Sequence, residues 1–128
     1  MNEGQPVHEI ANEFFERLVA VFPQLAEDYE IHVENEGQVL AHVFLSIDVV
    51  PAALAAYSGQ DGDYQDLDWR ALLTYLDDTF PTADPYLQKA IVTSFLMDLP
   101  WPTEPGYGII EHLGPVLAAK FHEARPAG

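Results

Sequence analysis

The chain has 128 residues, 48% of them hydrophobic, and its 21 acidic residues against five basic ones give a formal charge of −16. Disordered acidic chains have low hydrophobicity, so this composition favours a folded domain with a surface of about 6,800 Å². The charge argues against nucleic acid or an anionic membrane as a direct ligand. The absence of cysteine excludes disulfides and thiolate metal sites.

The amino end carries no sign of export. Residues 1–6 lack the basic and apolar segments of a signal peptide, and no apolar run approaches the roughly 18 residues of a membrane span. A single soluble domain over residues 1–128, located in the cytoplasm, is therefore expected.

The first predicted helix runs from Val7 to Phe22, because apolar residues recur there at steps of three and four. Pro23 ends it or begins the next segment. A second helix is predicted from Gln24 to Glu36. Gly37 suits the left-handed position that follows a last helical turn.

The stretch from Val39 to Val50 fits two structures. It is rich in β-branched residues, as a strand would be, but an apolar run of this length also fits a buried helix. Because helices are predicted on both sides, helix is favoured and a minor strand at 39–50 is kept as the alternative. Pro51 suits the first turn of a following helix.

Residues 58–66 read as a polar loop, and helical spacing resumes from Trp69 to Phe80, with Asp66 or Asp68 able to cap its start. Asp84 and Pro85 then open a helix that extends to Leu99.

Three prolines within residues 100–106 exclude regular helix there. The last predicted helix covers Tyr107 to Glu123 and is kinked or broken at Gly114-Pro115, and residues 124–128 form a frayed tail. The predicted fold is all-α: a small single-domain bundle of five to seven short helices.

The strongest functional signal is a stretch from Leu18 to Trp69 that has no lysine or arginine over 52 residues and contains ten carboxylates. Such a field attracts cations and basic protein surfaces. The predicted partner-binding acids lie on the second helix and in the polar loop: Glu27, Asp28, Glu30, Glu34, Glu36, Asp61, Asp63, Asp66 and Asp68. Tyr64 in that loop is added because aromatic area beside carboxylates suits arginine and lysine.

No catalytic or metal-binding pattern accompanies these acids. The loop that begins at Asp61 resembles a calcium loop, but the sixth and twelfth positions hold Asp66 and Leu72 in place of glycine and glutamate. The five histidines lack the spacing of a zinc helix, although His32 is four residues from both Asp28 and Glu36. We therefore predict no enzyme activity, no metal and no cofactor.

Trp101 lies between two prolines on a stiff connection. A tryptophan held in this way either anchors an interface or closes the end of the helical core. It is included among the predicted partner-binding residues.

Three segments occur together: Val39 to Leu45, Val92 to Leu99, and Leu113-Gly114-Pro115. Through them the chain resembles a family of small, acidic, helical bacterial proteins of unknown function, some of which look like immunity proteins against polymorphic toxins. Ala41 replaces the proline expected before His42, and Asp98 stands where asparagine is usual. The resemblance implies a small helical fold and supplies no catalytic residue.

Charge and resemblance together predict an immunity or inhibitor protein that binds a basic toxin domain, for example a nuclease, through its acidic surface. The alternative is an adaptor or regulatory module that binds its partner in an apolar groove between helices. The first predicts strong salt dependence of binding, and the second predicts weak salt dependence.

Overall fold

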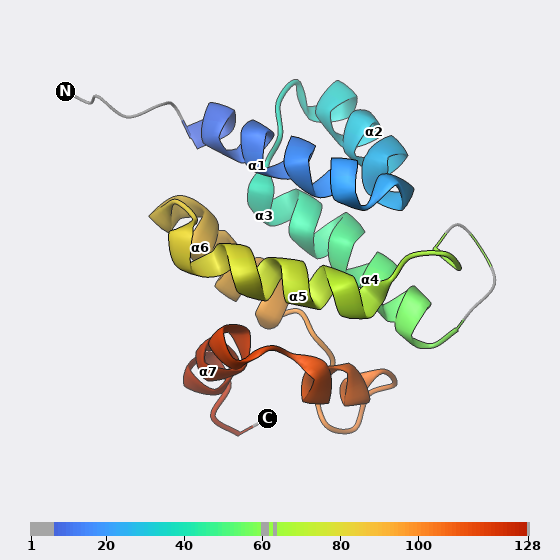
Figure 1. Cartoon of the computed structure of the whole chain (residues 1–128), viewed down its shortest axis with the longest axis vertical. Helices are drawn as coiled ribbons and strands as arrows, with labels where there is room; N and C mark the ends of the chain where they lie inside the picture. The colour runs from blue at the N-terminus through green and yellow to red at the C-terminus, as the bar shows by residue number, and fades with distance from the viewer. Residues whose placement is uncertain (1–6, 60–61, 63, 128) are drawn as a thin grey trace.

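The computed structural model describes residues 7–59, 62 and 64–127, with the backbone alone for Val7 and His8. Seven α-helices occur in this part of the chain (Figure 1). They are α1 (Val7–Val21), α2 (Ala26–Glu36), α3 (Ala41–Phe44), α4 (Val50–Tyr57), α5 (Trp69–Thr79), α6 (Pro85–Ile91) and α7 (Pro115–Ala124). Helix makes up 74% of the structure and the described residues contain no strand, so the all-α prediction is confirmed.

Short helical turns of other types connect or extend the α-helices. The 3₁₀ turns are η1 (Pro23–Leu25), η3 (Phe80–Thr82) and η5 (Tyr107–His112). The π-helical turns, in which the N–H of each residue bonds five residues back, are η2 (Leu45–Val49) and η4 (Val92–Leu96).

Local sequence signals explain where several helices begin and end. Gly37 has φ +78° and its N–H donates to the Val33 carbonyl, which closes α2 as predicted. The Asp68 carboxylate accepts from the Ala71 N–H at 3.0 Å, and the Asp84 carboxylate caps α6 in the same way. The predicted interruption at Gly114-Pro115 is a full break between η5 and α7.

The ambiguous segment at 39–50 is helical, and the alternative of a minor strand is wrong. Residues 41–57 form one continuous rod of α3, η2 and α4. Pro51 has no N–H to donate to the carbonyl four residues back, and the helix passes it through a π-turn in which the Val50 N–H donates to the Leu45 carbonyl. Phe44, Leu45 and Val49 of the rod are fully buried in the core, which accounts for much of its apolar character.

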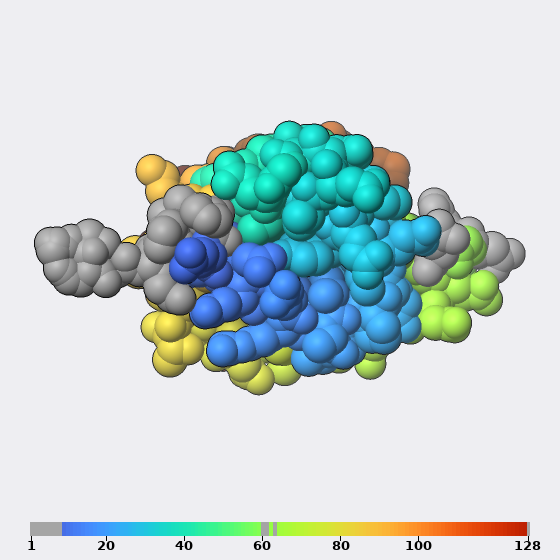
Figure 2. Space-filling model, turned by 90° about the horizontal axis from the view of Figure 1, so that it is seen from above, coloured from blue at the N-terminus to red at the C-terminus, as the bar shows by residue number. Residues whose placement is uncertain are grey.

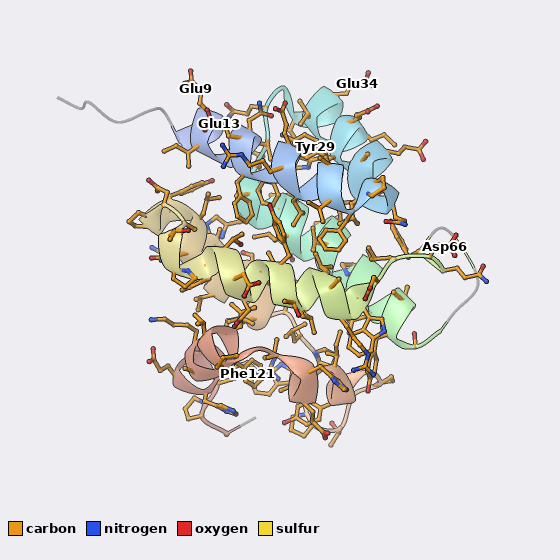
Figure 3. The ribbon with its side chains drawn as sticks, viewed as in Figure 1. Glu9, Glu13, Tyr29, Glu34, Asp66 and Phe121 are labelled. Carbon is orange, nitrogen blue, oxygen red and sulfur yellow. The ribbon has the colours of Figure 1, made fainter. Side chains whose placement is uncertain are left out.

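The helices pack around one apolar core. Figure 1 shows α1 and α2 at one end of the bundle, α7 and η5 at the other, and the α3–α4 rod and α5 between them. At the first end Phe15 and Tyr29 pack edge-on against Phe44, with ring centroids 5.3 and 5.4 Å from it. Figure 3 shows Tyr29 and Phe121 pointing between helices, whereas Glu9 and Glu34 point outward.

The prediction of a frayed tail over 124–128 is wrong for its first two residues. Ala124 is the last residue of α7, and Arg125 is only 2% exposed. The Arg125 guanidinium donates to the carbonyls of Leu96, Leu99 and Pro100 at 3.3, 2.6 and 2.8 Å. The end of α7 is thereby attached to the last residue of η4 and to the segment that follows it.

Among the described residues, no helix has both the length and the apolar character needed to cross a membrane.

Candidate functional site

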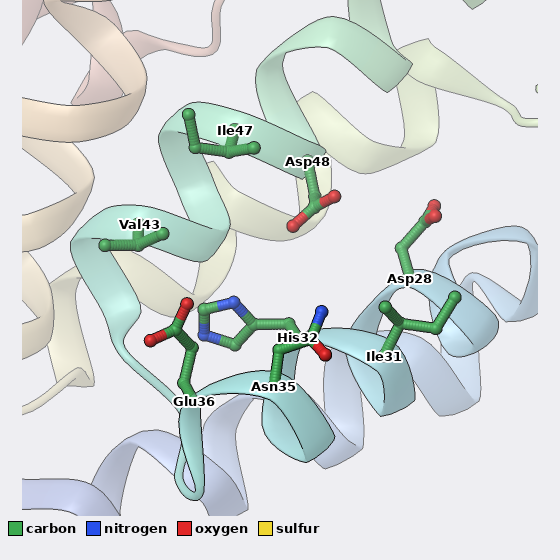
Figure 4. A pocket seen from close by; sticks show the side chains of 8 residues that line it. All are labelled: Asp28, Ile31, His32, Asn35, Glu36, Val43, Ile47 and Asp48. Carbon is green, nitrogen blue, oxygen red and sulfur yellow. The ribbon is translucent and has the colours of Figure 1, made fainter.

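The candidate site is a groove between α2 and the η2 end of the α3–α4 rod. It is a hollow of about 210 Å³ lined by Asp28, Ile31, His32, Asn35, Glu36, Val43, Ile47 and Asp48 (Figure 4). The α1–α2 end of the molecule is seen from above in Figure 2, where α2 and the start of the rod lie next to α1. Every residue of the groove comes from the stretch that has no lysine or arginine.

The walls of the groove are apolar and exposed. Ile31, Val43 and Ile47 are 48%, 38% and 64% exposed, and they are three of the five large hydrophobic side chains exposed in the described part of the chain. Val43 and Ile47 are four residues apart on the helical rod and share a face, while Ile31 comes from α2. Apolar residues gathered on a surface in this way mark interaction sites more often than scattered ones do.

Carboxylates border these walls on both helices. Asp28 and Glu36 come from α2 and Asp48 from η2. Burial raises the pKa of Asp48, and the negative charge of Asp28 raises it further, whereas His32 lowers it. No ion pair to any of the three occurs within the described residues, so the groove has an uncompensated negative potential.

His32 is buried, with 6% of its surface exposed, and its ring reaches the floor of the groove. The Leu40 N–H donates to His32 Nε2 at 2.9 Å, so the neutral ring carries its proton on Nδ1. Figure 4 shows the other ring nitrogen directed towards Asp48. No hydrogen bond joins the two in the described structure, so Nδ1–H remains a donor facing the groove.

The structure brings the two predicted acidic segments together. The Tyr64 hydroxyl donates to the Asp28 carboxylate at 2.6 Å, and the Gln24 side chain donates to the Asp66 carbonyl at 3.2 Å. The loop before α5 is thus attached to the start of α2, beside the groove. Asp68, also predicted to bind the partner, caps α5.

The other predicted residues lie apart from the groove or outside the described structure. Glu27, Glu30 and Glu34 are exposed on α2 but do not line the groove. Asp61 and Asp63 lie outside the described residues.

Trp101 is 43% exposed, and the Arg125 guanidinium stacks on its ring at 3.8 Å from the centroid. One face of the indole therefore covers a buried cation at the end of the core, in line with the second of the two roles considered for it. It lies in the segment between η4 and η5 and contributes nothing to the groove.

Sequence reasoning missed the apolar walls and Asp48. Val43 and Ile47 belong to a mostly apolar run, so periodicity did not distinguish its exposed face from its buried ones. The spacing of Asp28, His32 and Glu36 at four-residue steps was the available signal, and all three line the groove.

The described residues contain no group of three or more His, Asp or Glu side chains placed to hold a metal ion. The groove is also smaller than the roughly 300–1,000 Å³ of typical small-molecule sites. Its walls are apolar and its border is acidic.

The molecule is thus a small all-α protein with an acidic, apolar-walled groove near one end. It belongs to the family of the domain of unknown function DUF7674, whose model matches residues 15–125. No curated protein and no solved structure matches the chain.

Proposed function

We propose that this protein binds a basic protein partner and that the groove between α2 and η2 is the centre of the interface. The supporting observation is the combination found there: three exposed apolar side chains beside three carboxylates that form no ion pair with a lysine or arginine of the described residues. Apolar contact supplies affinity, and the carboxylates select a positively charged partner and accelerate its association.

The acids outside the groove extend this surface. Glu27, Glu30 and Glu34 are exposed on α2, and Asp66 is exposed beside its start. Charges of this kind at the rim of an interface raise the association rate and make it salt-dependent, with little effect on dissociation. The acidic surface and the apolar groove, first considered as separate hypotheses, are therefore parts of one binding surface in this proposal.

An immunity or inhibitor role is the specific form of this proposal that the sequence resemblance suggests. In that form the partner is a basic toxin domain, and the acidic surface covers the lysines and arginines with which it grips its substrate. The alternative form is an adaptor or regulatory module that binds a harmless partner in the same groove.

Capture of the partner with matched variants tests the proposal. The tagged full chain is used on lysate of its source organism at low and high salt, beside an Ile31→Ser/Ile47→Ser double variant. Val21→Ser is the control, because Val21 is 54% exposed on α1 and lies outside the groove. We expect a basic protein that the wild type and the control retain at low salt and that the double variant loses.

Equal retention of the partner by the double variant and the wild type would contradict the proposal.

If the double variant does lose the partner, expression of that partner alone separates the immunity form of the proposal from the adaptor form. Growth arrest that is relieved by coexpression of this chain supports the immunity role, and normal growth supports the adaptor.

A further inference from the structure

The groove has the dimensions and chemistry of a receptor for one long cationic side chain, an inference that rests on the proposed function and specifies its partner. At about 210 Å³ the hollow accepts a side chain but not a folded element. Ile31, Val43 and Ile47 form apolar walls for a chain of methylene groups. Arginine and lysine bury such stems on apolar surface while their charged ends reach polar groups.

The carboxylates are placed on both sides of the hollow to receive the charged end. Asp28 from α2 and Asp48 from η2 face the groove from opposite helices (Figure 4). One oxygen of Asp28, Oδ2, accepts from the Tyr64 hydroxyl, which holds the carboxylate in position and leaves Oδ1 for a further donor. A cation between the two aspartates also relieves the mutual repulsion that contributes to the raised pKa of Asp48.

His32 supplies a hydrogen-bond donor beside the two aspartates. This side chain is 94% buried, since 6% is exposed, and its Nδ1–H faces the groove without a hydrogen-bond acceptor in the described structure. A ligand acceptor that enters the groove can take this hydrogen bond in place of solvent. A peptide carbonyl is such an acceptor, and a basic side chain attached to a peptide carries both groups.

We infer that the groove between α2 and η2 binds an arginine side chain of the partner, with its guanidinium between Asp28 and Asp48 and a neighbouring main-chain carbonyl at His32 Nδ1. Arginine is chosen over lysine because its planar fork has five donors and reaches two carboxylates at once.

Titration of the full chain with short peptides tests this inference by NMR. The probes are Ac-Gly-Arg-Gly-NH₂, the same peptide with citrulline, which keeps the shape but has no charge, and the same peptide with lysine. We expect saturable shifts of the Ile31, Val43 and Ile47 methyl signals with the arginine peptide. The citrulline peptide should bind at least about tenfold more weakly than the arginine peptide, because hydrogen bonds to charged groups are the stronger ones. The lysine peptide should also bind more weakly than the arginine peptide, because lysine lacks the planar fork of donors.

Two variants locate the contact. Asp48→Asn should weaken binding of the arginine peptide by about tenfold, whereas Glu30→Gln, which removes the same charge from an exposed site on α2, should change it less than about twofold. An unfolding temperature no lower than that of the wild type and unchanged spectra outside the groove show that each variant is folded.

The inference is overturned by equal binding of the arginine and citrulline peptides, by shifts confined to other surfaces, by no shift at all, or by lysine binding as tightly as arginine. These results leave the proposed function standing if the partner is still lost from the Ile31→Ser/Ile47→Ser variant. The proposed function itself is contradicted if the Ile31→Ser/Ile47→Ser variant retains the partner in the capture experiment.

Discussion

The contact between Asp77 and Gly114 gives a sharp prediction about how the last helix is attached to the bundle. Gly114 is the N-cap residue of α7 and has no side chain with which to cap it. The buried carboxylate of Asp77, on α5, performs this role: the Leu117 N–H donates to its Oδ1 at 2.8 Å. A Cβ atom added to Gly114 would lie 2.3 Å from Asp77 Cγ and 2.4 Å from its Oδ2.

Gly114→Ala should therefore lower the free energy of unfolding by about 2–3 kcal/mol, the worth of a hydrogen bond to a charged group. The backbone itself accepts alanine, since φ is −68° and ψ is 172°. The cost comes from displacement of the carboxylate, which leaves the start of α7 without its acceptor. Thermal unfolding followed by circular dichroism should show a midpoint lowered by about 10 °C.

A double-mutant cycle tests the cause. Asp77→Ala alone loses the cap and should cost about 2 kcal/mol, but it also removes the atoms that collide with the new Cβ. In that background Gly114→Ala should cost less than about 0.5 kcal/mol, so the two changes are strongly non-additive. An equal cost of Gly114→Ala in both backgrounds would refute the reasoning.

Three further predictions concern other parts of the molecule. Arg125→Met should destabilise the fold by about 3 kcal/mol or more in urea unfolding, because three carbonyls lose their donor, while Lys120→Met should have little effect. Gly37→Ala should lower the free energy of unfolding by about 1 kcal/mol, since Gly37 has φ +78°, and Gly37→Asn should lower it by less. Equal losses for the two variants in urea unfolding would contradict this account of how α2 ends. The raised pKa of Asp48 means that the folded state holds its proton more tightly, so this carboxylate reduces stability as the pH rises through its folded pKa. Asp48→Asn should therefore raise the unfolding temperature at pH 7, and the gain should vanish below the ordinary pKa of 3.8; a gain that persists at lower pH would exclude the charge as its cause.

Signals carried by neighbouring residues predicted much of the fold. Asp84-Pro85 correctly predicted the start of α6 and Gly37 the end of α2, because these capping residues act within a single helical turn. Gly114-Pro115 predicted the break before α7, but the carboxylate that caps α7 belongs to Asp77, 40 residues before the Leu117 N–H that it accepts from. The sequence could not indicate that partner.

The tail and the π-turns depended on contacts distant in sequence. Polar and small residues after Glu123 suggested fraying, yet Arg125 is held by carbonyls 25 to 29 residues earlier. Both π-turns lie where the α3–α4 rod and the helix through η4 pack together, and no local pattern indicated them.

The candidate site was predictable in charge but not in shape. The acidic stretch and the four-residue spacing of Asp28, His32 and Glu36 were visible in the sequence. The groove exists because α2 and η2 lie opposite each other, and only the tertiary structure defines that arrangement. The exposed positions of Val43 and Ile47 followed from that packing.

The most direct test of a basic partner bound at the groove compares two variants that remove equal charge. Asp28→Asn/Asp48→Asn removes two carboxylates that line the groove, whereas Glu27→Gln/Glu30→Gln removes two exposed carboxylates from α2. The dissociation rate of the captured partner should rise by about tenfold or more with the first variant and by less than about twofold with the second. Equal rates for the two variants would show that total charge, and not the groove, holds the partner.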